Sequence, residues 1–274
     1  MSSRKNVHNM RYVRMFLLFF QDVNVQRARS FVWFLLSLLN PLLLLVFWSG
    51  VYAQNHGMLQ GWSLSTISSY YILLIIASAF LDVHIEETVA ILDIREGGLV
   101  KYLTRPFSYF WLMFLSELPW RVFQGGLGVL IFLFFALFFN NLIQLTQDPV
   151  IIILSFLVIG LAYMLSFVFK MILGLSAFWV TDFWGLQQLV EVTALSFAGF
   201  LMPLEFYPKI LEQIAYILPF SYIIYFPVVA IQGKLSALQL FQILGIQALW
   251  ICALTVCYRY LWRKGIEKFV GVGQ

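Results

Sequence analysis

The run PVIIILSFLVIGLAYMLSFVF, from Pro149 to Phe169, holds no charged residue and lies between Asp148 and Lys170. An uncharged, mostly apolar helix of about 20 residues matches the ~30 Å hydrocarbon core of a bilayer. The rest of the chain is similar in character, with 62% hydrophobic and only 11% charged residues. Soluble domains, by comparison, are about 45–50% apolar. The sequence therefore predicts an all-α membrane protein that crosses the bilayer several times.

Working outward from this run, we predict one transmembrane domain over residues 1–274 with six spans. The run itself is the fourth span, and its helix is expected to continue to about Trp179. The predicted spans are residues 31–53, 64–81, 119–139, 149–169, 186–202 and 235–262. Cys252 and Cys257 lie inside the sixth, where we interpret them as small apolar helix residues rather than a disulfide or metal pair.

The distribution of Lys and Arg predicts the orientation of these spans, because cytoplasmic loops carry an excess of both. The loops 54–63 and 140–148 contain neither residue. Basic residues gather in three other places. Before the first span lie Arg4, Lys5, Arg11, Arg14, Arg27 and Arg29, and between the second and third spans lie Arg95, Lys101 and Arg105. At or after the end of the sixth span lie Arg259, Arg263, Lys264 and Lys268. Both termini are therefore predicted to be cytoplasmic. The net charge of +4 suits such basic edges and does not indicate binding to nucleic acid.

The N-terminal segment 10–29 is predicted to be an amphipathic helix in the plane of the inner interface. Arg11 and Arg14 share one helical face, and aromatic and aliphatic residues occupy the other, which is the pattern of an interfacial helix. A simple polybasic topology anchor is the alternative interpretation.

The segment 204–231 is predicted to form re-entrant helices on the outer side. Its most apolar part, Ile217–Ile231, has only about 15 residues, too few for a span, and Pro219 and Pro227 interrupt it. A crossing at this point would also place the basic C-terminus outside.

The stretch ILDIREGGLVKYLTRPFSYF, Ile91–Phe110, is unusually charged for this chain. We predict a cytoplasmic helix over 83–103, lying along the membrane, in which Glu86, Asp93 and Glu96 form a charged face. The Gly97-Gly98 pair is expected to end its first helical part. Such a helix can provide a binding surface for a soluble partner. The alternative interpretation is an ordinary solvated loop.

Glu117 and Arg121 near the cytoplasmic end of the third span, and Glu191 in the fifth, are ionisable residues at membrane depth, where such residues are functional candidates by default. Glu117 and Arg121 stand four apart on one helical face, so they either neutralise each other or take part in gating. Glu191 lies about one turn into the fifth span, where it either lines the transport path or pairs with Lys170 or with the surroundings of Asp182.

Two passages resemble the membrane subunit of ABC-2 type exporters: EGGLVKYLTRPFSYFW (Glu96–Trp111), and GFLMPLEFYPKILEQIAYILPFSYI (Gly199–Ile223) with Pro203, Pro208 and Pro219. The order of segments along the whole chain agrees. The resemblance implies that 83–103 is a coupling helix for a separate ATPase and that the outer helices form a gate. The residues implied for coupling are Glu86, Asp93, Arg95, Glu96, Gly97, Gly98, Lys101 and Arg105. The possible pathway or gate residues are Glu117, Arg121, Glu191, Pro203, Pro219 and Phe220.

The resemblance further implies a bacterial cytoplasmic membrane, a second permease, identical or related, and a hydrophobic or amphipathic substrate. The chain has no G-x-x-x-x-G-K-[ST] motif, so no cofactor is expected on it, and ATP and Mg²⁺ are expected on the partner ATPase. A secondary transporter, a structural scaffold and a membrane-embedded lipid-processing enzyme are the alternatives. The enzyme is disfavoured because His8, His56 and His84 fall on segments assigned to opposite sides of the membrane.

Overall fold

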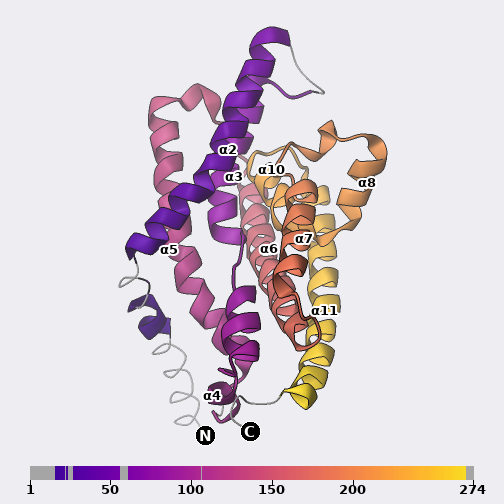
Figure 1. Ribbon diagram of the computed structural model, residues 1–274. Helices are drawn as coiled ribbons and strands as arrows, with labels where there is room; N and C mark the ends of the chain where they lie inside the picture. The colour runs from indigo at the N-terminus through magenta and orange to yellow at the C-terminus, as the bar shows by residue number, and fades with distance from the viewer. Residues whose placement is uncertain (1–15, 22, 24–26, 56–60, 106, 270–274) are drawn as a thin grey trace, which may run out of the picture.

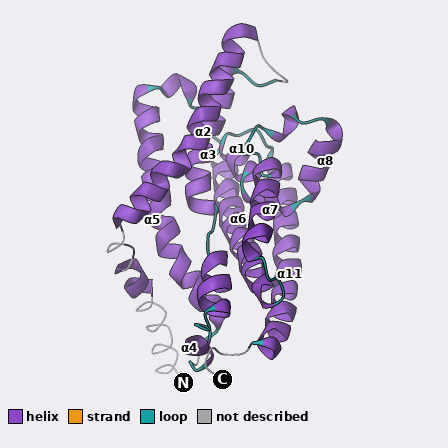
Figure 2. Ribbon diagram, in the orientation of Figure 1, coloured by secondary structure: helices purple, strands orange, loops and turns teal. Residues whose placement is uncertain are grey.

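The computed structural model describes residues 16–21, 23, 27–55, 61–105 and 107–269 (Figure 1). Within these ranges the secondary structure is helical and contains no strand (Figure 2). Half of the predicted in-plane helix at 10–29 lies outside the described residues. Of that segment, residues 16–21 are helical. The predicted all-α class is confirmed for the described part of the chain.

In the described part of the chain, five helices are long and apolar enough to cross a membrane: α2 (Arg27–Asn55), α3 (Leu64–Leu81), α5 (Tyr109–Phe138), α6 (Pro149–Leu175) and α11 (Ala237–Lys268). Helix α3 has the bounds predicted for the second span. Helix α6 is prolonged by the short helix η3 (Ser176–Phe178), so the expected continuation to about Trp179 is confirmed.

The third predicted span begins too late. Helix α5 starts at Tyr109, ten residues before Pro119, and continues through that proline. An interior proline removes one backbone hydrogen bond, yet Pro119 is buried within the continuous helix.

Helices α3 and α6 form the centre of the bundle. In their most apolar windows, 67% of the α3 residues and 44% of the α6 residues are buried, against 17–22% for α2, α5 and α11. The outer helices instead expose large apolar side chains, such as Leu43, Leu137 and Val256. Exposed apolar surface on this scale is typical of a membrane-embedded protein and unfavourable in water.

Polar caps fix where several of these helices begin. Ser63 accepts a hydrogen bond from the Thr66 amide at the start of α3, and Asp148 accepts one from Val150 before α6, which has proline at its first position. Ser236 and Gln239 form a reciprocal capping box at the start of α11. These residue types satisfy amides that a helix leaves without an internal partner.

The two ends of the bundle are distinguished by their short helices. At the η1 end, where η1 (Thr88–Arg95) and α4 (Val100–Leu103) lie, Tyr109 at the start of α5 stacks on Trp262 near the end of α11, with ring centroids 4.8 Å apart. At the η2 end, where η2 (Asn140–Leu142) joins α5 to α6, the Ser69 hydroxyl donates to the Gln144 carbonyl over 3.0 Å. Figure 1 shows α4 at the bottom of the bundle.

The prediction of a helical fifth span over 186–202 is wrong in its bounds. Helix α7 runs from Phe183 to Phe197 and is about 22 Å long at 1.5 Å per residue, too short to cross the hydrocarbon core. It stops because Gly199 has φ +87°, and a Cβ there would lie 2.5 Å from the Tyr70 hydroxyl oxygen. The remaining distance is covered by turns and by η4 (Leu204–Phe206).

The segment after η4 folds back on itself. Helix α8 (Lys209–Ile217) meets the pair α9 (Pro219–Ile223) and α10 (Tyr225–Ile231) at a bend of 67°. Both ends of this hairpin lie at the η2 end, because Phe206 packs on Trp62 and the Gln232 side chain donates to the Thr66 carbonyl over 3.0 Å. At its tip Phe220 packs on Phe169, towards the other end of α6, with centroids 5.2 Å apart.

Candidate functional site

The connection between α3 and η1 is a non-helical elbow, residues 82–85, held by side chains of two neighbouring helices. From α5, Arg121 Nη1 donates to the Asp82 carbonyl over 2.7 Å, and Glu117 Oε1 accepts from the His84 amide at 3.2 Å. From α6, the Ser166 hydroxyl accepts from the Val83 amide at 3.4 Å. The backbone groups freed by the break are thus satisfied, as buried backbone groups must be.

Two buried ion pairs surround this elbow. Arg121 Nε lies 2.6 Å from Glu117 Oε1 on α5, and Lys170 Nζ of α6 lies 2.6 Å from Glu86 Oε1, one residue past the elbow. Glu86 is fully buried and Lys170 is 8% exposed. Burial raises the pKa of Glu86, and the positive charge of Lys170 offsets part of that rise. The predicted neutralisation of Glu117 by Arg121 is confirmed, and the same pair also holds the elbow.

Asp93 occupies the core of the η1 end rather than its surface. Its side chain is fully buried, the Tyr109 hydroxyl donates to its Oδ2 over 2.7 Å, and Lys101 Nζ lies 3.7 Å from its Oδ1. Burial raises the pKa of this carboxyl. The expectation that Glu86, Asp93 and Glu96 share one exposed face is therefore wrong for Glu86 and Asp93, and only Glu96 is exposed.

The charged segment also differs from the single helix predicted over 83–103. The helical part begins at Glu86, after the elbow, and from Thr88 to Arg95 it is a π-helix. Gly97 ends it with φ +78°, as expected of the glycine pair, and the Leu99 amide then donates to the Asp93 carbonyl over 2.8 Å. The short helix α4 follows.

The accessible part of this segment is mixed apolar and charged. Arg95 is exposed, and its guanidinium donates to the carbonyls of Val180 and Thr181 before α7. Six of the exposed side chains on η1, α4 and the turns that flank α4 are together called the docking face, namely Leu92, Glu96, Val100, Lys101, Leu103 and Arg105.

An internal cavity of about 1130 Å³ opens beside the elbow. Its lining comes from α2, α3, α5, α6, α7 and α9, with charged residues gathered near the elbow and apolar residues towards the tip of the hairpin. Of the predicted pathway or gate residues, Glu117, Arg121, Glu191 and Phe220 line this cavity. Pro219 is the first residue of α9 and Pro203 precedes η4, both buried and outside the lining.

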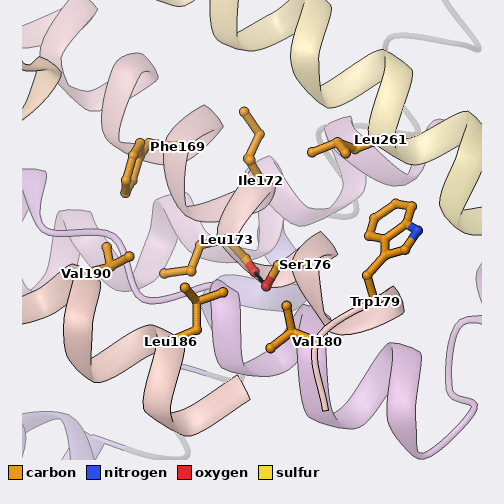
Figure 3. A pocket seen from close by; sticks show the side chains of 9 residues that line it. All are labelled: Phe169, Ile172, Leu173, Ser176, Trp179, Val180, Leu186, Val190 and Leu261. Atoms are coloured by element: carbon orange, nitrogen blue, oxygen red, sulfur yellow. Dashed lines mark hydrogen bonds between the residues drawn. The ribbon is translucent and has the colours of Figure 1, made fainter. Parts of the chain in front are cut away.

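A second, smaller pocket of about 340 Å³ lies between α6, α7 and α11 (Figure 3). Aliphatic and aromatic side chains form most of its lining, and the Ser176 hydroxyl donates to the Leu173 carbonyl over 2.6 Å. Leu186 and Val190 of α7 face Leu173 across it. With no charged lining residue, this pocket is suited to apolar packing only.

Sequence reasoning missed several residues of the site. The Glu86–Lys170 pair joins positions 84 apart in the chain, and its one local signal was a lysine directly after an uncharged run of span length. Gln187 is buried and donates from Nε2 to Glu87 Oε1 and Glu191 Oε1 over 3.0 and 2.8 Å. Its place as the second residue of the predicted fifth span gave no indication of this bridge.

The structure combines long apolar helices with a clamped elbow and a cavity between the helices. These features are typical of a multi-pass membrane protein with a binding space, and they suit a membrane transport protein. The family model of the ABC-2 family transporter protein matches residues 38–273. The chain belongs to this family. It is accordingly a permease of an ABC transporter, a membrane transport subunit rather than an enzyme, and membership implies association with an ATP-binding cassette ATPase. No curated protein and no solved structure matches the chain.

Proposed function

We propose that this permease exports a hydrophobic or amphipathic substrate, driven by an ATP-binding cassette ATPase that docks on the docking face. The observation that carries the proposal is the clamped elbow. The Glu86–Lys170 pair connects η1 to α6, and the Glu117–Arg121 pair connects the elbow before η1 to α5. Because these contacts are short and buried, a displacement of η1 passes to helices that line the cavity.

The docking face has the composition of a protein interface. Leu92, Val100 and Leu103 expose 45–49% of their surface beside charged groups, and apolar anchors with a charged rim are typical of interfaces. ATP and Mg²⁺ would be bound by the partner ATPase. The carboxylates Glu86 and Asp93, being buried, would act by positioning η1 rather than by touching that partner.

At the other end, the hairpin α8–α10 would form the outer gate. Its tip reaches Phe169 on α6 and it returns to the η2 end, as a re-entrant element does, and Phe220 closes the apolar side of the cavity. A second permease, identical or related, would complete the pathway, because the cavity is bordered by α2, α5 and α7, helices that leave much apolar surface exposed.

The docking role predicts a selective loss of the ATPase. We expect Leu103→Asp and Val100→Asp to reduce the ATPase recovered with the affinity-purified permease at least tenfold, since apolar anchors of an interface are worth about 1–4 kcal/mol each. The matched control is Gln147→Asp, an exposed residue between η2 and α6, which is expected to retain wild-type recovery. Undiminished ATPase recovery with both docking-face variants would exclude this face.

The orientation predicts which thiols react from outside. In a Cys252→Ala/Cys257→Ala background, Gln147→Cys should react with an impermeant maleimide in intact cells, and Glu96→Cys should react only after the cells are opened. Both side chains are exposed, so accessibility within the fold does not limit either reaction. External labelling at Glu96 would reverse the orientation and remove the docking assignment with it.

A further inference from the structure

The cavity and its elbow carry more negative than positive charge. Among the described residues, five carboxylates lie around this end, those of Asp82, Glu86, Glu87, Glu117 and Glu191, against the two cations Lys170 and Arg121, which leaves an excess of three. His84 lies 3.7 Å from Asp82 and is half-exposed. Lys170 and Arg121 are each engaged by a carboxylate at 2.6 Å. The carboxylates without a paired cation, Asp82, Glu87 and Glu191, are exposed or half-buried, and such an excess of negative charge in a cleft attracts a cation.

Part of this excess negative charge lies on one wall of the cavity, which is formed by α7 and the residues that precede η1. One amide, Gln187 Nε2, supplies hydrogen bonds to both Glu87 and Glu191, over 3.0 and 2.8 Å. These two bonds fix the orientation of the amide, since the opposite orientation would turn its oxygen towards two carboxylates. Gln187 itself is only 5% exposed, yet its Oε1 has no hydrogen-bond partner among the described residues.

This wall therefore accepts hydrogen bonds and has few donors of its own. Gln187 Oε1 is a buried acceptor without a partner among the described residues, which costs about 1–3 kcal/mol. The exposed Glu87 and the half-buried Glu191 add unused lone pairs beside it. A ligand that brings several N–H donors and a positive charge satisfies all three groups at once, through charge-assisted hydrogen bonds.

The other lining of the cavity restricts the ligand further. Phe200, Phe220, Ile223 and Ile224 form an apolar wall towards the hairpin, and Trp120 and Trp184 also line the space. An inorganic cation would leave this wall without a partner, and the described residues contain no group of three His, Cys, Asp or Glu side chains suited to hold a metal ion. The lining fits a molecule that is cationic at one end and apolar at the other.

We propose that the cavity binds an amphipathic amine, whose protonated N–H groups donate to Glu87, Gln187 and Glu191 while its apolar body lies against Phe220, Ile223 and Ile224. The inference rests on the proposed export function, because it identifies this amine as the class of transported substrate. It commits to a hydrogen-bonding ammonium rather than to positive charge alone.

The test is ligand binding by the full-length permease in lipid nanodiscs. The probe is tritiated 4-phenylbutylamine, measured by scintillation proximity with empty nanodiscs as background. Its trimethylammonium analogue and 4-phenylbutanol serve as unlabelled competitors. We expect saturable binding of the amine, with both competitors at least tenfold weaker, because the first has charge without N–H donors and the second has no charge at pH 7.

Isosteric variants connect the binding to the wall. Glu191→Gln and Glu87→Gln should each weaken amine binding about tenfold or more, since the ammonium then donates to a neutral amide oxygen instead of a carboxylate, while competition by the alcohol stays unchanged. The matched control is Glu267→Gln, an exposed residue near the end of α11, which should bind the amine as wild type does. Equal binding of amine and alcohol, equal binding of the trimethyl analogue, or an unchanged affinity in Glu191→Gln would each overturn the proposal.

Recovery of the ATPase with the same preparations separates the two proposals. A permease that retains its ATPase but shows no amine selectivity would leave the exporter assignment standing and refute the substrate class. A permease that binds the amine selectively but recovers no ATPase would refute the docking assignment and leave the binding site standing.

Discussion

Replacing Lys170 with Met is expected to lower the free energy of unfolding by about 3–5 kcal/mol, the usual cost of leaving one charge of a buried pair without its partner. Glu86 is fully buried, and its Oε1 accepts the Lys170 bond at 2.6 Å while its Oε2 has no partner among the described residues. Because methionine preserves much of the volume of lysine, the loss of stability measures the effect of removing the charge. Thermal or denaturant unfolding of the detergent-solubilised permease measures it.

The pH dependence of this variant has a definite sign. Without Lys170, burial still raises the pKa of Glu86 in the folded state, so the folded protein binds more protons than the unfolded chain and stability falls as pH rises. The difference in unfolding free energy between wild type and Lys170→Met should therefore be largest near pH 8. It should become smaller towards pH 5, where protonation of the Glu86 carboxyl removes the unpaired charge.

Two further variants control for the volume change. Glu86→Gln/Lys170→Met should recover most of the lost stability, because neither side chain then carries a charge. Lys264→Met removes a cation from an exposed pair with Glu267 and should leave unfolding nearly unchanged. A Lys170→Met variant as stable as the wild type at pH 8 would mean that Glu86 is already neutral in the native protein.

Hydropathy and capping predicted the central helices well because both signals are local. An uncharged run bounded by Asp148 and Lys170 leaves one way to satisfy its backbone in a bilayer, which is a helix. Ser63 before α3 and Asp148-Pro149 before α6 marked the starts of these helices. Hydropathy alone placed the end of α7 wrongly, since that end depends on Tyr70, a residue of another helix, lying against Gly199.

The charged segment was misread because its face was assigned from α-helical spacing. Between Thr88 and Arg95 the structure is a π-helix with bonds from residue i to i+5, such as the Glu96 amide to the Ile91 carbonyl at 2.9 Å. The wider turn changes which side chains share a face, and Asp93 points into the core. The pairing of Glu86 with Lys170 depends on how α6 packs on η1, which no local pattern encodes.

A second large effect is expected from a substitution at Gly98, in the turn after η1. A Cβ at this position would lie 2.5 Å from the Leu92 carbonyl oxygen and 3.2 Å from Asp93 Oδ1. Since the first of these is a backbone atom, the turn has to open rather than a side chain rotate, at a cost of about 1–3 kcal/mol. We expect Gly98→Ala to displace α4 and with it Val100, Lys101 and Leu103 of the docking face.

Limited proteolysis measures this displacement without knowledge of the substrate. Trypsin cuts after Arg95 and Lys101, and cleavage of a locally opened segment follows the free energy of opening. Gly98→Ala should be cut here about tenfold faster than wild type and should recover less ATPase. The matched control is Gly126→Ala in α5, where an added Cβ meets nothing within 4 Å and alanine favours the helix. Cleavage and ATPase recovery at wild-type levels in Gly98→Ala would show that the tight turn is dispensable, and that docking does not depend on how η1 sets the position of α4.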